Sequence, residues 1–143
     1  MLFGKRERAI RRILVVEDEP LVAFDNEHLL TESGYEVVAT VDSLAEAVRV
    51  LGEEDGIDLI LSDISLAGDG DGTDVARAAA AKRVPVLFVT GNCPIEARSL
   101  ALGCLAKPYS GKMLKNALKA VERTLRGENV KRVPAGLSLY EQA

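Results

Sequence analysis

The sequence has few of the residues that metal centres and disulfide-stabilised folds require. It contains one histidine, His28, and two cysteines, Cys93 and Cys104, which are too far apart for a CxxC motif. Structural zinc sites use four thiolate or imidazole ligands at short spacing, so such a site is not expected. We expect Cys93 and Cys104 to be reduced, semi-buried thiols rather than a disulfide, and His28 to be a surface or boundary residue.

Long hydrophobic runs and a secretion signal are also missing. The longest apolar runs, such as residues 84–89, are far shorter than the ~20 residues of a membrane-spanning helix. The basic start at residues 5–8 leads into a short apolar stretch that has no small-residue cleavage site. We therefore expect a cytoplasmic protein without a membrane partner.

Charge is unevenly distributed over the chain. The net charge is −4, but residues 104–132 carry eight Lys or Arg against two acids. The lysines of residues 110–126 have no aromatic residues between them, so this stretch does not indicate a nucleic-acid partner. A solvated helix face is the simpler interpretation, and a protein contact is the sharper alternative.

Short β-branched runs alternate with stretches of helical period, a pattern typical of βα units and a parallel sheet. The predicted strands cover residues 13–16, 36–40, 58–63, 84–90 and 104–106. Helices are predicted at 20–33, 43–51, 73–82 and 110–126, and any helix between residues 91 and 103 has about two turns. The predicted organisation is an α/β domain at residues 12–126, a basic extension at 1–11 and a tail at 127–143. Leu137, Leu139 and Tyr140 could dock this tail on the domain.

The apolar spacing of the helices predicts which side chains face the core. The predicted inward residues are Leu21, Phe24, Leu29 and Leu30 in the first helix, Leu44, Ala47, Val48 and Leu51 in the second, and Met113, Leu114, Ala117, Leu118, Val121 and Leu125 in the last. The acids of the glycine-rich loop, Asp69, Asp71 and Asp74, lack the closing glutamate of a calcium loop. They indicate turn and N-cap chemistry instead.

Polar side chains gather where the predicted strands end. The first strand is followed by Glu17 and Asp18, the third ends at Asp63, the fourth at Thr90, and the fifth is followed by Lys107. In an open parallel sheet, ligands bind outside the carboxyl ends of the strands. Adjacent carboxylates repel one another, and oxygen ligands that leave room for water and phosphate are typical of Mg²⁺ sites. A lysine and a threonine hydroxyl suit a phosphoryl group.

Four stretches of the sequence together resemble the receiver (CheY-like) domains of two-component response regulators. They are residues 13–20, 59–64, 85–90 and 107–109, and the resemblance extends from about residue 12 to residue 126. It implies a flavodoxin-like (βα)5 fold with a doubly wound parallel sheet, strand order 2-1-3-4-5 and a shortened fourth helix. Carboxylates at strand ends are common, but all four stretches in order are highly specific.

The resemblance also implies a role for each matching residue. Asp63 would accept the phosphoryl group from phosphohistidine on a histidine kinase or histidine phosphotransfer protein. Asp18, Asp63 and the backbone carbonyl of Ser65 would bind Mg²⁺ directly, and Glu17 would act through a bound water. Lys107 would pair with a phosphoryl oxygen, with Pro108 in a cis peptide bond, and Thr90 would bond the phosphoryl group and move inward.

The chain also departs from the usual receiver pattern. Cys104 stands three residues before Lys107, where most receivers have an aromatic switch residue. Gly91 replaces the usual alanine, and the segment from Thr90 to Lys107 is short. These features resemble the FAT GUY group of stand-alone receivers from alphaproteobacteria, although Val89 and Asn92 deviate from that motif. We expect the short fourth helix to be mobile and to become ordered on phosphorylation or Mg²⁺ binding.

The sequence leads to one main functional hypothesis and two alternatives. The main one is a single-domain response regulator of a phosphorelay that acts on a downstream protein partner or passes the phosphate on. Receivers catalyse their own phosphorylation and hydrolysis, so no independent metabolic enzyme activity is expected. A receiver-like module that binds partners without phosphorylation is the first alternative. The second is a small Mg²⁺-dependent phosphatase, which would need a second acid where Ser65 stands.

Overall fold

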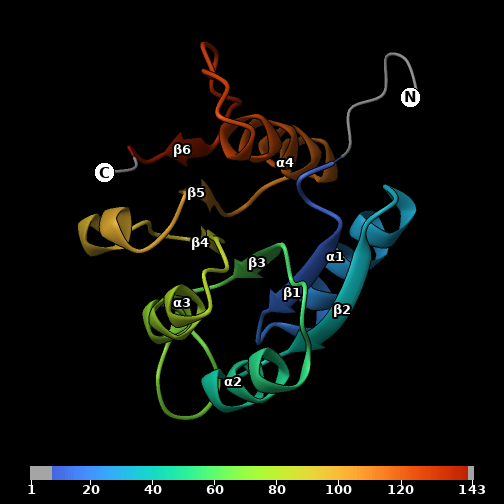
Figure 1. Ribbon diagram of the computed structural model, residues 1–143, viewed down its shortest axis with the longest axis vertical. Helices are drawn as coiled ribbons and strands as arrows, with labels where there is room; N and C mark the ends of the chain where they lie inside the picture. The colour runs from blue at the N-terminus through green and yellow to red at the C-terminus, as the bar shows by residue number, and fades with distance from the viewer. Residues whose placement is uncertain (1–7, 142–143) are drawn as a thin grey trace.

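Six strands form one sheet in the order β2-β1-β3-β4-β5-β6 (Figure 1). The computed structural model describes residues 8–141, so most of the basic N-terminal extension lies outside the described residues. The strands are β1 (Arg12–Val16), β2 (Glu36–Val41), β3 (Leu59–Ser62), β4 (Val86–Thr90), β5 (Gly103–Ala106) and β6 (Leu137–Leu139). The helices are α1 (Pro20–Glu32), α2 (Leu44–Glu53), α3 (Gly72–Ala81) and α4 (Gly111–Leu125), with a 3-10 helix, η1, at Ile95–Ser99. The α/β class and the strand order 2-1-3-4-5 are confirmed.

The central strands are buried on both faces, which explains their nearly unbroken apolar sequence. On one face, Ile13 and Val15 of β1 join a core cluster with Leu118 of α4. On the other face, Leu14 and Val16 join a cluster with Val75 of α3. Helices α1 and α4 therefore cover one side of the sheet and α2 and α3 the other, as Figure 1 shows. The first five strands are parallel, so their carboxyl ends meet at one edge.

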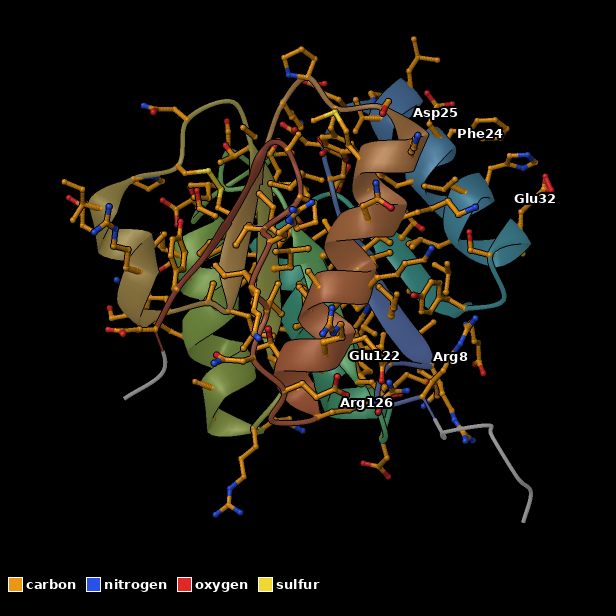
Figure 2. The ribbon with its side chains drawn as sticks, turned by 90° about the horizontal axis from the view of Figure 1, so that it is seen from above. Arg8, Phe24, Asp25, Glu32, Glu122 and Arg126 are labelled. Carbon is orange, nitrogen blue, oxygen red and sulfur yellow. A yellow bond between two sulfur atoms is a disulfide. The ribbon has the colours of Figure 1, made fainter. Side chains whose placement is uncertain are left out.

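The predicted inward face of α1 is wrong for two of its four residues. Leu30 is buried and Leu29 packs against the core, but the residues Leu21 and Phe24 are 80% and 66% exposed. Apolar residues occur on both faces of this helix, so hydrophobicity alone does not decide which face turns inward. The inward face instead includes the polar residue Asn26, which is 3% exposed. Phe24 points outward in Figure 2. Its ring stacks on that of His28, which is exposed as predicted.

The prediction of the inward face of α2 is also wrong for one residue. Ala47 and Leu51 are buried, and Leu44 packs against the core, but Val48 is 47% exposed. Val50 is buried instead. A helix has about 3.6 residues per turn, so Val48 and Val50, two residues apart, point to nearly opposite sides and only one of them can face the sheet. The last helix follows its prediction in part, because Met113 and Leu125 are only half-buried and Ala120, which was not predicted, is buried. Leu114, Ala117, Leu118 and Val121 of α4 are buried.

The tail contributes a strand that the sequence did not predict. β6 pairs antiparallel with β5, with Ser138 opposite Cys104. Two further backbone hydrogen bonds fix its ends: Ala106 N donates to Gly136 O at 2.9 Å, and Tyr140 N donates to Leu102 O at 2.9 Å. Leu137 is buried. The tail therefore covers the edge of the sheet at β5.

The expectation of two reduced thiols is wrong, because Cys93 and Cys104 form a disulfide. Cys93 follows β4 and Cys104 lies on the adjacent parallel strand β5, where it pairs with Phe88. Parallel neighbours bring these residues together with a Cα–Cα distance of 6.2 Å, within the normal range for a disulfide. The separation of 11 residues in sequence gives no sign of this proximity.

Hydrogen bonds to α4 anchor the N-terminal end of the described chain. At the N-terminal end, the carboxylate of Glu122 on α4 accepts hydrogen bonds from Ala9 N at 2.7 Å and Ile10 N at 3.0 Å. Figure 2 shows Arg8, Glu122 and Arg126 gathered at the C-terminal end of α4.

No helix in residues 8–141 is long and apolar enough to cross a membrane.

Candidate functional site

Three carboxylates meet at the carboxyl edge of the sheet. Glu17 and Asp18 follow β1, and Asp63 follows β3, which is the direct neighbour of β1. One carboxylate oxygen from each residue lies within 4.8 Å of the other two. Glu17 and Asp63 are buried and Asp18 is half-buried. The structure thus brings together the three acids that the sequence predicted.

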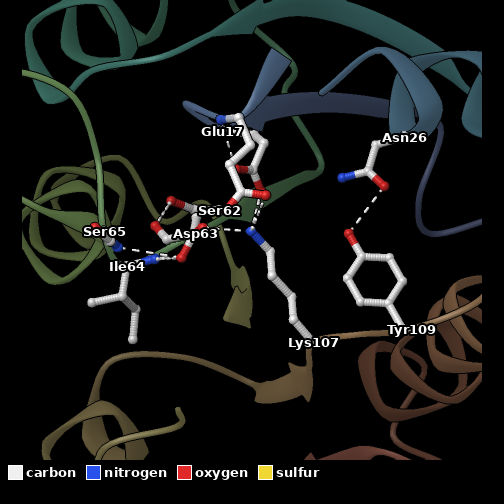
Figure 3. A network of polar contacts seen from close by, with 9 residues as sticks. Glu17, Asn26, Ser62, Asp63, Ile64, Ser65, Lys107 and Tyr109 are labelled. Atoms are coloured by element: carbon white, nitrogen blue, oxygen red, sulfur yellow. Dashed lines mark hydrogen bonds and ion pairs between the residues drawn. The ribbon is translucent and has the colours of Figure 1, made fainter. Parts of the chain in front are cut away.

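The carboxylate of Asp63 is held from both sides. Its Oδ1 accepts hydrogen bonds from the backbone N–H groups of Ile64 at 2.6 Å and Ser65 at 3.2 Å. Its Oδ2 accepts one from the Lys107 ammonium at 2.7 Å. Figure 3 shows these contacts converging on Asp63. The side chain is therefore fixed at the end of β3 with its polar contacts satisfied.

Lys107 joins two of the acids. Its Nζ lies 2.7 Å from Asp63 Oδ2 and 3.0 Å from Glu17 Oε1. Burial lowers the pKa of Lys107, but hydrogen bonds and attraction from Asp63 and Glu17 outweigh this and hold the pKa above its ordinary range. The ammonium therefore stays charged at neutral pH and balances one of the three carboxylates.

Glu17 is the most deeply buried acid of the cluster. Its side chain is fully buried, and its Oε2 accepts a hydrogen bond from the backbone N–H of Glu19 at 3.1 Å. Burial raises the pKa of Glu17, and the contacts to Glu19 and Lys107 oppose that rise. Oε1 lies 3.0 Å from Lys107 Nζ in an ion pair and accepts no further hydrogen bond from the described residues. This oxygen has acceptor capacity for a further donor.

Thr90 and Lys107 lie on neighbouring strands beside the acids. Thr90 ends β4 and is buried, and its carbonyl accepts a hydrogen bond from the backbone N–H of Lys107 at 2.8 Å. The Lys107–Pro108 peptide bond is cis, as the sequence predicted. Every side chain predicted for the site thus lies at the same edge of the sheet.

Three residues around the site were not predicted to take part in it. Ser62 is buried, and its hydroxyl donates to the carbonyl of Asp63 at 2.7 Å. Tyr109 donates to Asn26 at 3.0 Å and so connects the segment after Lys107 to α1, as Figure 3 shows. Burial raises the pKa of the Tyr109 hydroxyl. No local sequence pattern marks the contact of Tyr109 with Asn26, because it depends on the packing of α1 against the segment after β5.

The loop before α3 carries structural acids. Asp71 caps α3 by accepting hydrogen bonds from Thr73 N at 2.8 Å and Asp74 N at 3.3 Å. Asp74 returns the contact by accepting from Asp71 N at 3.0 Å, which completes a capping box. Asp71 is therefore the N-cap residue and Asp74 the N3 residue of the capping box, in agreement with the predicted N-cap chemistry.

Comparisons with known proteins agree with this geometry. Residues 13–119 match the family model of the response regulator receiver domain. The chain is 39% identical over 79 residues to the phyllosphere-induced regulator PhyR of Methylorubrum extorquens, covering 54% of this chain and 30% of that protein. It is 36% identical over 106 residues to the transcriptional regulatory protein PdtaR of Mycobacterium tuberculosis, covering 70% and 51%. The chain thus spans about half or less of these relatives.

Solved structures show the same fold. The solution structure of SdrG from Sphingomonas melonis Fr1 matches with a TM-score of 0.67 and 34% identity, covering 80% of this chain and 98% of that one. The anti-anti-sigma factor PhyR from Bartonella quintana matches with a TM-score of 0.68 and 28% identity, covering 85% and 51%. These matches agree with the resemblance to alphaproteobacterial receivers. The family match, the strand order and the acidic edge lead to one conclusion: the chain belongs to the receiver domains of two-component response regulators.

Proposed function

We propose that the chain accepts a phosphoryl group on Asp63 from phosphohistidine of a histidine kinase or histidine phosphotransfer protein, in a Mg²⁺-dependent reaction. The observation that carries this proposal is the meeting of Glu17, Asp18 and Asp63 at one edge, with Lys107 Nζ 2.7 Å from Asp63. Carboxylates act as nucleophiles in enzymes that form aspartyl phosphates. The same edge is where ligands of open parallel sheets bind.

The residues present fit a magnesium ion. Three carboxylates balanced by one lysine leave an excess of negative charge, and Oε1 of Glu17, which is ion-paired with Lys107 at 3.0 Å, retains a lone pair that can accept a hydrogen bond from a metal-bound water. In the proposal, Asp18, Asp63 and the carbonyl of Ser65 bind the ion directly, and Glu17 acts through water. The ion supplies positive charge that offsets the charge on the transferring phosphoryl oxygens.

The chain's own groups account for the rest of the transfer. A carboxylate oxygen of Asp63 attacks phosphorus, the new P–O bond forms, and the P–N bond to the donor imidazole breaks. Lys107 then pairs with a phosphoryl oxygen, and the Thr90 hydroxyl donates a hydrogen bond to another. The phosphoryl group adds charge at a buried position, so the groups around it rearrange toward it.

The proposed output is contact with other proteins. We propose that the protein is cytoplasmic and that it signals to a protein partner or passes its phosphate on. The lysines of α4 have no neighbouring aromatic residues on that helix, which favours a protein partner over a nucleic acid. Residues 91–103 are proposed to become ordered by phosphorylation. Between β4 and β5 they contain only a five-residue 3-10 helix, and Ile95 in it is 75% exposed.

A phosphorylation assay tests the proposal. The purified protein is incubated with acetyl phosphate and Mg²⁺, and intact-mass spectrometry measures the addition of one phosphoryl group. Wild type and Asp69→Asn, an exposed acid of the nearby loop, are expected to be labelled equally, and Asp63→Asn not at all. Chelation of Mg²⁺ is expected to abolish labelling. Labelling of Asp63→Asn at the wild-type level, or no labelling of folded wild type, would contradict the proposal.

A further inference from the structure

The disulfide between Cys93 and Cys104 closes the connection from β4 to β5 at its base. Figure 2 draws disulfide bonds in yellow. Cys93 lies three residues after Thr90, and Cys104 lies three residues before Lys107. The bond therefore links the two chain segments that carry the non-acidic groups of the proposed phosphoryl site.

The first part of the closed loop, residues 94–100, has few other anchors. Only Ala97 is buried there, and η1 is five residues long, whereas the chain is buried from Ala101 into β5. The residue Ile95 is 75% exposed. The disulfide therefore adds a covalent restraint, at Cys93, to a stretch that is held by few buried side chains.

The two sulfur atoms differ in access. Cys104 is fully buried, whereas Cys93 is partly exposed and lines a cavity of about 490 Å³ together with Arg98 and Tyr140. A small thiol can therefore reach Cys93 and not Cys104. The cavity is lined by one cation, Arg98, and one acid, Glu141. A positive charge near a cysteine favours its thiolate form.

We propose that Cys93 and Cys104 are a reversible redox pair that controls how far the segment 91–103 responds to the phosphoryl site. The inference rests on the proposed function. In a compartment where thiol reductants are abundant, a disulfide is usually transient and regulatory. The oxidised pair restrains the segment, and the reduced pair releases it.

The chemistry needs only a low-molecular-weight thiol and its disulfide. The thiolate attacks Cys93, the protein S–S bond breaks, and Cys104 leaves as a thiolate that takes up a proton. A second thiol attacks the small-molecule sulfur of the mixed disulfide, which releases Cys93 as a thiol and forms the small disulfide. One protein disulfide and two thiols thus become two protein thiols and one small disulfide, and oxidation is the reverse.

The first arm of the test measures the redox pair itself. Wild type is equilibrated with oxidised or reduced glutathione, free thiols are counted after denaturation by maleimide labelling and mass, and amide hydrogen exchange of the folded protein is measured. Reduction is expected to expose two thiols reversibly and to speed exchange at residues 91–103 at least tenfold, with exchange in β1 and α4 unchanged. The variant Cys93→Ser is expected to exchange fast in both conditions. The proposal would be overturned if amide exchange at residues 91–103 of wild type had the same rate in the oxidised and the reduced protein.

The second arm measures coupling to the phosphoryl site. Beryllofluoride with Mg²⁺, which stands in for the aspartyl phosphate, is added to both redox forms of wild type and to Asp63→Asn. Its protection of residues 91–103 is expected to be at least threefold larger in the reduced protein and absent in Asp63→Asn. Equal protection in both redox forms would overturn the redox inference and leave the proposed function standing. No response in either form would overturn both.

Discussion

Gly72 lies against the backbone of Asp63. A Cβ atom at Gly72 would overlap the carbonyl oxygen of Asp63 and would lie 2.6 Å from the Cα atom of Ile64. The Gly72 N–H also donates to the carbonyl of Ile64 at 2.7 Å. The first turn of α3 can therefore approach the chain after β3 only because residue 72 has no side chain.

Gly72→Ala is expected to lower both stability and phosphorylation. The added methyl group meets backbone that cannot move aside without shifting Asp63, and overpacking of this kind costs about 1–3 kcal/mol. The free energy of unfolding is measured by urea denaturation, and labelling by acetyl phosphate is measured under conditions where the variant is folded. Labelling at least tenfold slower than wild type is expected.

Gly52→Ala is the matched control for this substitution. Gly52 lies in α2, and a Cβ atom there has no neighbour within 4 Å. Alanine in a helix interior is favoured over glycine by about 0.5–1 kcal/mol, so this variant is expected to be slightly more stable and to be labelled normally. If Gly72→Ala behaved like Gly52→Ala, the close approach of α3 to Asp63 would have no functional importance.

The site was predictable from sequence because its residues stand at the ends of short, strongly apolar strands. Parallel strands bring their carboxyl ends to one edge, so Glu17, Asp18, Asp63 and Lys107 had to meet once the strand order was known. Pairings across the sheet were not predictable in the same way. The contact of Cys93 with Cys104 depends on the register of β4 with β5, which no spacing within the chain encodes.

The errors in the fold have a similar origin. Leu21 and Phe24 are apolar but exposed, because α1 carries apolar residues around most of its circumference and its inward face is set by docking on the sheet. β6 was missed because it has only three residues and pairs with a distant strand. Short strands are specified by their partners more than by their own sequence.

The docking of β6 depends on a second glycine. A Cβ atom at Gly103 of β5 would overlap the carbonyl oxygen of Ser138 in β6. Gly103→Ala is therefore expected to displace the tail strand, to speed amide exchange at Leu137–Leu139, and to lower the free energy of unfolding by about 1–3 kcal/mol. Gly91→Ala, whose Cβ has no neighbour within 4 Å, is the control. Unchanged exchange at Leu137–Leu139 in Gly103→Ala would show that β6 stays docked and that the close approach at Gly103 is not required.

The N-cap of α3 predicts a change in stability at acid pH. Hydrogen bonds from the Thr73 side chain and from the backbone of Thr73 and Asp74 hold the pKa of Asp71 below its ordinary value near 3.8. A carboxyl group with a lowered pKa in the folded state stabilises the fold above its unfolded pKa and loses that effect as the pH falls through the folded pKa. Stability is therefore expected to fall as the pH drops below about 4.

Urea denaturation from pH 6 to pH 2.5 separates this contribution from those of other acids. Asp71→Asn keeps a capping oxygen but cannot titrate, so its stability is expected to fall less steeply over this range than that of wild type. Asp71→Ala is expected to lose about 1 kcal/mol at neutral pH because the cap is removed. Asp69→Asn serves as the control, since Asp69 is exposed in the same loop and outside the cap. Parallel pH profiles for wild type and Asp71→Asn would contradict the assignment.

The hydrogen bond from Tyr109 to Asn26 joins the segment after Lys107 to α1, and its removal is expected to destabilise the protein. Asn26 is 3% exposed, its Nδ2 has no partner among the described residues, and its Oδ1 accepts from Tyr109 at 3.0 Å. Tyr109→Phe leaves both polar atoms of the amide buried without a partner, so a loss of about 1–3 kcal/mol is expected from urea denaturation.

A double variant shows whether this loss comes from the unpaired amide. Asn26→Leu removes the buried polar group and keeps a side chain of similar size, so Tyr109→Phe combined with Asn26→Leu is expected to recover most of the stability lost in Tyr109→Phe. If the stability losses of the single variants Tyr109→Phe and Asn26→Leu simply added in the double variant, the two residues would not be coupled energetically. Labelling by acetyl phosphate in the double variant then measures the remaining effect: slower labelling at restored stability would mean that this polar contact, rather than overall packing, positions Lys107 beside Asp63.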